Sequence, residues 1–92
     1  MKTTLEVSIT TPDRGILMVH KEINLPFAPH CDMTISDIAW KNEKKIISVS
    51  LIIDPDSQEP SLYIRLESDN AKDADEQNCL TKTYESCEWQ SI

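Results

Sequence analysis

Apolar and polar residues alternate along the first part of the chain in a pattern that predicts a β-hairpin. Within residues 3–10, positions 5, 7 and 9 are apolar and positions 6 and 8 are polar, as in a strand with one buried face. A second apolar strand is predicted at 16–25. Between them, residues 11–15 hold a proline, an aspartate and the only glycine of the chain, Gly15, which suits the φ > 0 position of a tight reversal.

The middle of the chain predicts a second group of strands. Residues 45–54 have the most regular strand pattern, and residues 61–67 predict a strand that pairs back on it across a polar, proline-bounded connection. Residues 33–40 allow two interpretations, because Thr34-Ile35-Ser36-Asp37 also resembles a helix capping box. We favour a strand, the first arm of a hairpin with 45–54. The residues of 45–54 predicted to share one face are Ile47, Val49, Leu51 and Ile53.

The amino-acid composition changes at residue 68, where β-branched residues are replaced by Ala, Lys, Glu and Gln. This composition predicts a helix over roughly 70–86, capped by Ser68 or Asp69. We therefore predict an α+β fold: an antiparallel sheet of four to five strands, built as a hairpin plus a meander, with a C-terminal helix packed on one face. Residues 1–92 are predicted to form a single domain.

The charge of the chain is strongly negative and unevenly spread. The net charge is −7, and residues 67–92 hold seven of the 16 acidic residues but only two of the nine basic ones. Such a patch attracts basic surfaces and repels free DNA and RNA. The alternative is a solvated helix face that keeps a small protein soluble. The candidate partner-binding residues in this acidic patch are Asp69, Asp73, Asp75 and Glu76.

A second candidate surface is cationic and lies at the predicted tip of the second hairpin. Three lysines follow an aromatic residue there, which is a combination that contacts a phosphate backbone and stacks on a base. The alternative is that the lysines limit aggregation of the apolar strand that follows them. The residues of this cationic tip are Trp40, Lys41, Lys44 and Lys45.

Catalysis and metal binding have little support in the sequence, and we expect neither an enzyme nor a cofactor. One glycine is too few for a phosphate-binding loop, and His20 and His30 have no local partner that marks them as bases. Cys31, Cys79 and Cys87 are odd in number and lack the spacing of zinc ligands, so we expect reduced thiols and no metal site. No apolar run approaches the ~20 residues that cross a bilayer, so no membrane partner is expected.

Over its whole length the chain resembles small phage-encoded anti-CRISPR proteins directed at type I-F surveillance complexes. The resemblance lies in size, acidity and general texture, for example over residues 45–54 and the following Tyr63-Ile64-Arg65-Leu66. It implies a non-enzymatic inhibitor that binds the Cas protein–guide RNA complex and blocks target DNA capture or hybridisation. The expected location is then the cytoplasm of an infected bacterial host. The acidic patch would compete for Cas residues that hold DNA, and the cationic tip would touch guide RNA.

Two other functions remain open from the sequence. One is a small phage accessory or regulatory protein that binds nucleic acid through the cationic tip, although the negative net charge disfavours binding to free duplex DNA. The other is a small metal or thiol protein that uses Cys31, Cys79 and Cys87.

Overall fold

The computed structural model describes residues 2–12, 15–53, 55–56 and 59–91. Within these ranges the chain forms a sheet and one helix near its C-terminal end, so the α+β class and the terminal helix are confirmed. In chain order the elements are β1 (Lys2–Thr11), β2 (Gly15–Asn24), β3 (Thr34–Ile35), β4 (Lys44–Ile52), β5 (Ser61–Leu66), β6 (Asp69–Asn70), α1 (Ala74–Ser86) and β7 (Gln90–Ser91).

The first two strands form the predicted hairpin. β1 and β2 pair antiparallel from Lys2 opposite Asn24 to Thr11 opposite Gly15. Gly15 has a φ of 77°, a left-handed conformation in which a side chain would be strained. The predicted turn also includes residues 13 and 14, which lie outside the described residues.

The sheet is mixed, which corrects the prediction of four to five antiparallel strands. The strand order is β3-β4-β5-β1-β2-β7, and β5 runs parallel to β1, with Thr3 opposite Leu62 and Glu6 opposite Arg65. β6 pairs with β1 further along, also in parallel. The period-two pattern specifies which face of a strand is buried but says nothing about its neighbour or direction. Of the seven strands in the described residues, three have only two residues, too few to show any pattern.

The pairing of β4 with β5 is antiparallel as predicted, but a bulge between Ile46 and Ser48 interrupts it. The predicted face of this strand is therefore partly wrong. Ile46 is buried opposite Leu66, whereas Ile47 is 52% exposed. An extra residue on one strand shifts the alternation by one position.

Residues 33–40 are mostly irregular. The strand in this segment, β3, is only Thr34 and Ile35, so the first arm of the predicted hairpin is two residues long and the alternative helix is absent from residues 33–40. Trp40 lies in the connection between β3 and β4, where its backbone N–H donates to the carbonyl of Asp37.

The helix begins later than predicted, at Ala74 rather than near residue 70. Asp73 is its N-cap and accepts a hydrogen bond from the Glu76 backbone N–H at 2.9 Å. Neither Ser68 nor Asp69 caps it, because Asp69 and Asn70 pair with β1 as β6 and the N–H of Ala71 bonds the carbonyl of Thr10. Backbone groups committed to a sheet are not free to start a helix.

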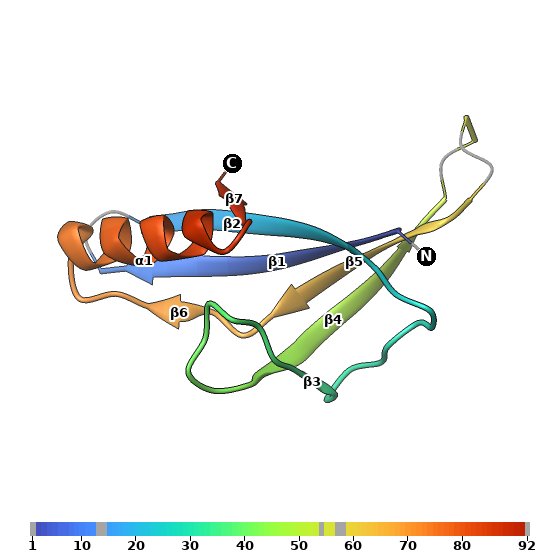
Figure 1. Ribbon diagram of the computed structural model, residues 1–92, viewed down its shortest axis with the longest axis horizontal. Coiled ribbons are helices and arrows are strands. Elements are labelled where there is room, and N and C mark those ends of the chain that lie inside the picture. The colour runs from blue at the N-terminus through green and yellow to red at the C-terminus, as the bar shows by residue number, and fades with distance from the viewer. Residues whose placement is uncertain (1, 13–14, 54, 57–58, 92) are drawn as a thin grey trace.

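The core lies between the sheet and α1, which covers the end of the sheet formed by β1 and β2 (Figure 1). At the opposite end of the molecule, β4 and β5 extend well beyond the part of the sheet that the helix covers (Figure 1). Among the described residues, no helix is both long and apolar enough to span a bilayer. The buried core residues are Leu5, Val7, Ile9, Val19, Ile46, Ile64, Leu66, Ala71, Tyr84 and Trp89.

Candidate partner-binding site

A groove of about 450 Å³ brings members of both predicted surfaces together. Its walls are the connection before β4, the start of β4, β6 and one side of α1. Trp40, Lys41 and Lys44 of the cationic tip line it, and so does Asp69 of the acidic patch. No local pattern indicates that these two surfaces meet, because Lys44 and Asp69 lie 25 positions apart in the chain.

Lys44 and Asp69 neutralise each other inside this groove. The Lys44 Nζ lies 2.5 Å from Asp69 Oδ1 and also donates to the carbonyl of Glu67 at 3.1 Å. The Lys44 side chain is only 11% exposed. The two charges therefore satisfy each other, and this ion pair joins the start of β4 to β6.

Trp40 and Tyr84 are linked to this ion pair by hydrogen bonds. The Trp40 Nε1–H donates to the Tyr84 hydroxyl at 2.8 Å, and that hydroxyl donates to Asp69 Oδ2. Burial and the neighbouring Asp69 carboxylate raise the pKa of Tyr84 far above its usual value, so this phenol stays protonated. The Lys44 ammonium also lies 5.7 Å from the centre of the Trp40 ring. Trp40 thus serves mainly to attach its loop to the helix.

Lys41 and Lys45 are the members of the cationic tip that remain at the surface. Both residues are exposed. The backbone N–H of Lys45 donates to Glu67 Oε1 at 2.6 Å, and the residue stays exposed. The cationic surface is therefore reduced from three lysines to two.

The other three residues of the acidic patch lie together at the start of α1. Asp73 and Asp75 are exposed and Glu76 is partly exposed, all at the N-terminal end of the helix. Glu85 and Glu88, near its C-terminal end, are exposed as well. Among the described residues, none of these five carboxylates takes part in an ion pair. Acidic side chains at both ends of α1 are therefore free of ion pairs with the rest of the described chain.

Asp37 is a structural acid that the sequence analysis missed. Its carboxylate accepts hydrogen bonds from the Lys21 ammonium at 2.9 Å and the Trp89 indole at 3.2 Å. The backbone N–H of Ala39 donates to it as well. Burial alone would raise the pKa of Asp37, but these hydrogen bonds outweigh it and lower the pKa below its usual value. No local pattern marks Asp37, since its partners lie 16 and 52 positions away.

The sheet face opposite α1 holds a cluster of polar side chains that the sequence did not predict. Glu6 is 1% exposed, and Arg65 donates to its Oε2 at 3.1 Å. The other carboxylate oxygen has no hydrogen-bond partner among the described residues and lies 3.9 Å from His20 Nε2. Burial and the nearby Glu6 charge raise the pKa of Tyr63, whose hydroxyl is 2.9 Å from the same His20 nitrogen. Strand alternation placed Glu6 on the polar face and could not show that neighbouring strands bury it.

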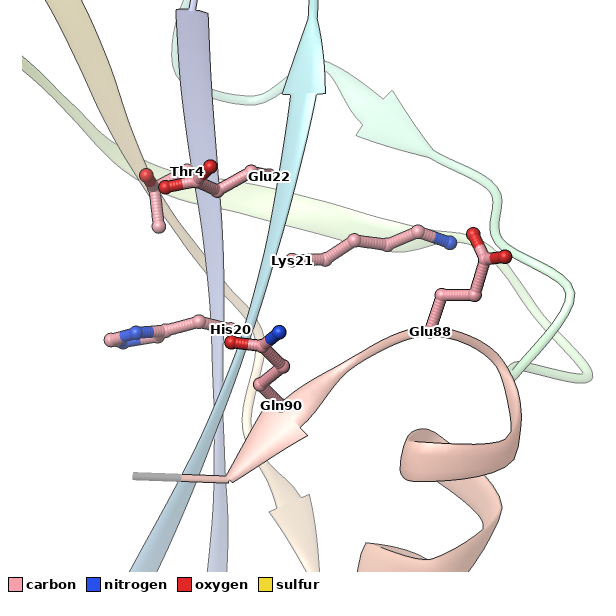
Figure 2. A pocket seen from close by; sticks show the side chains of 6 residues that line it. All are labelled: Thr4, His20, Lys21, Glu22, Glu88 and Gln90. Carbon is pink, nitrogen blue, oxygen red and sulfur yellow. The ribbon is translucent and has the colours of Figure 1, made fainter.

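A smaller hollow of about 270 Å³ lies beside β2 where the chain returns as β7 (Figure 2). Figure 2 shows Lys21 and Glu88 directed toward each other on one side of it. No residue of the acidic patch or cationic tip lines this hollow, so it does not extend either surface. The residues lining it are Thr4, His20, Lys21, Glu22, Glu88 and Gln90.

The three cysteines are free thiols in different parts of the chain. Cys31 and Cys79 are exposed and Cys87 is half-buried. The described ranges contain no group of three or more His, Cys, Asp or Glu side chains placed to hold a metal ion.

Comparison with known proteins found no similar protein. No protein-family model, no curated protein and no solved structure matches this chain.

Proposed function

We propose that this chain is a non-enzymatic inhibitor that binds a type I-F CRISPR–Cas protein–guide RNA surveillance complex and blocks target DNA capture or hybridisation. The observation that supports it is the N-terminal end of α1, where the carboxylates of Asp73, Asp75 and Glu76 have no ion-pair partner among the described residues. A cluster of acids at one end of a helix competes with DNA phosphates for lysines and arginines. The resemblance to type I-F anti-CRISPR proteins directs this binding to the Cas complex.

The proposed contacts differ from the sequence prediction at three residues. Asp69 and Lys44 are engaged with each other, and Trp40 is bonded to Tyr84, so these side chains hold the fold. The proposed Cas contacts are then Asp73, Asp75 and Glu76, and the proposed guide-RNA contacts are Lys41 and Lys45.

The test is a competition experiment with a purified type I-F surveillance complex. The complex is incubated with this protein, labelled target DNA is added, and co-elution is followed on a sizing column. We expect the protein to co-elute and the DNA to be lost. A protein that never co-elutes with the complex would overturn the proposal, and co-elution with DNA binding intact would overturn the capture step.

Charge reversal at Asp75 tests the acidic face itself. Asp75→Lys is expected to weaken association with the complex by about tenfold at low ionic strength and less at high salt, because salt screens exposed charges. Glu22→Lys is the matched control, since Glu22 is an exposed acid of β2 whose ion pair with Lys2 lies at the surface. Equal affinities for the two variants would remove the acidic face from the binding site.

A further inference from the structure

The outer edge of β4 is open over most of its length. β3 pairs with β4 only at Lys44 and Lys45, and the backbone of residues 32–33 continues the pairing to Ile46. The Cys31 thiol lies 3.5 Å from the carbonyl oxygen of Ile47. Beyond that point, to the end of β4 at Ile52, no other described strand lies on this side. An open strand edge offers a row of N–H and C=O groups to another strand.

The open segment is also apolar and uncharged. No charged residue occurs between Lys45 and Asp54 in the sequence. The usual protection of an edge by charged or proline residues is therefore missing from this stretch. Four large apolar side chains here stand about half exposed or more: Ile47 at 52%, Leu51 at 57%, Ile52 at 46% and Ile53 at 75%.

We propose that residues 47–53 form a self-association edge, at which two copies of this chain pair antiparallel about a two-fold axis at Ser50. That register places Val49 opposite Leu51 of the other copy and Ile47 opposite Ile53. Apolar side chains meet at these two pairs, Ser48 lies opposite Ile52, no charged residue is opposed, and the two sheets join into one. The contact uses the same patch on both copies, as closed two-fold dimers do.

A second copy fits this edge because residues 47–53 contain no charge that would face its own copy across a two-fold axis. A chain of net charge −7 repels its own copies, but the proposed contact contains no charge. The acidic helix lies at the other end of a molecule whose longest extent is 42 Å (Figure 1). At physiological salt, charges are screened over about 8 Å, so the two acidic ends do not oppose this contact. One strand pair is smaller than a standard interface of about 1,600 Å², which predicts a dimer in the micromolar range.

Analytical ultracentrifugation of the full chain, from about 1 to 500 μM, tests the proposal over the range expected for a small interface. We expect a reversible monomer–dimer equilibrium that high salt does not weaken. Ser50→Lys places two lysines opposite each other at the axis and is expected to weaken the dimer at least tenfold, because like charges directly opposite destabilise strand pairs. Ser68→Lys, the same change at an exposed serine outside β4, should leave it unaltered.

Cysteine cross-linking reads the register without disturbing the fold. In a Cys31→Ser/Cys79→Ser background, Ser50→Cys should form an intermolecular disulfide faster than Ser48→Cys, because only residue 50 faces its own copy. A chain that stays monomeric throughout the range, a folded Ser50→Lys protein that dimerises as the wild type does, or cross-linking that does not peak at residue 50 would each overturn the proposal. Pairing of this edge with a strand of another protein, in a chain that stays monomeric alone, would do so too.

Discussion

Glu88 occupies a backbone conformation that suits glycine. Its φ is 70°, and it directly follows Cys87, the C-cap of α1. The N–H of Trp89 bonds the carbonyl of Tyr84 and the N–H of Glu88 bonds that of Glu85, which is the hydrogen-bond pattern of a Schellman motif. The rings of Trp89 and Tyr84, 5.2 Å apart, supply the apolar contact that accompanies this motif. Glu88 is thus held in a strained conformation by a well-bonded helix end.

Replacing Glu88 with glycine is expected to stabilise the protein. Glu88→Gly relieves a left-handed strain of about 1–2 kcal/mol and loses part of this gain to the greater freedom of the unfolded chain, which leaves up to about 1 kcal/mol. Urea unfolding followed by circular dichroism measures it. Glu85→Gly, within the last turn of the helix, is the control and should destabilise by about 1 kcal/mol. A Glu88→Gly protein no more stable than the wild type would show that the strain is absent.

At the scale of elements, one tyrosine connects three separate segments. Tyr84 is buried on α1, accepts a hydrogen bond from Trp40 in the connection before β4, and donates one to Asp69 in β6. Lys44 completes the group from β4 through its ion pair with Asp69. The helix is therefore attached to the sheet by a polar network as well as by apolar packing. Such a network stabilises only while every member has its partner.

Removal of the Tyr84 hydroxyl should test this attachment. Tyr84→Phe leaves the Trp40 Nε1–H and one Asp69 oxygen without their partner, so we expect a loss of about 1–3 kcal/mol in the free energy of unfolding. The matched control is Tyr63→Phe, on the opposite face of the sheet, where the hydroxyl contacts the half-buried His20 and the expected loss is about 0.5–1.5 kcal/mol. Equal losses at the two tyrosines, measured by urea unfolding, would contradict the special role of Tyr84.

At the scale of the whole molecule, Asp37 holds together parts that are distant in the chain. Lys21 belongs to β2, Asp37 to the connection between β3 and β4, and Trp89 to the segment after α1. The Lys21 ammonium donates to the Cys87 carbonyl and lies 5.8 Å from the centre of the Trp89 ring. The Asp37 side chain is only 10% exposed, so its charge is stabilised mainly by these partners.

This arrangement predicts a specific dependence of stability on pH. Because the pKa of Asp37 is lower in the folded chain than its unfolded value of about 3.9, its ionised form stabilises the fold above roughly pH 5, and this contribution is lost as the pH falls through the folded pKa. Asp37→Asn should therefore lower stability by about 1–3 kcal/mol at pH 7. The difference from the wild type should shrink below about pH 4.

Urea midpoints of wild type and Asp37→Asn from pH 7 to pH 2.5 measure this dependence. Asp75→Asn, an exposed acid of the same type, is the control and should follow the wild-type profile. A difference between Asp37→Asn and wild type that stays constant down to the lowest pH would show that ionisation of Asp37 does not contribute.

The sequence by itself determined the features that depend on neighbours along the chain. Period-two alternation identified β1 and its buried face, the turn residues placed Gly15, and the change in composition at residue 68 predicted a C-terminal helix. The exposed carboxylates Asp73 and Asp75 of the candidate site also followed from local composition. These features were predictable because backbone sterics and side-chain spacing act within a few residues.

Only the tertiary structure decided how these elements pair and which charges remain available. The parallel contact of β5 with β1, the bulge in β4 and the place of Asp69 in a strand rather than at a helix cap depend on segments far apart in the chain. The same holds for Lys44, which the sequence offered as a partner contact and the fold uses for its ion pair with Asp69. A local pattern specifies the face of an element, whereas strand neighbours and ion pairs are selected by the packing of the whole chain.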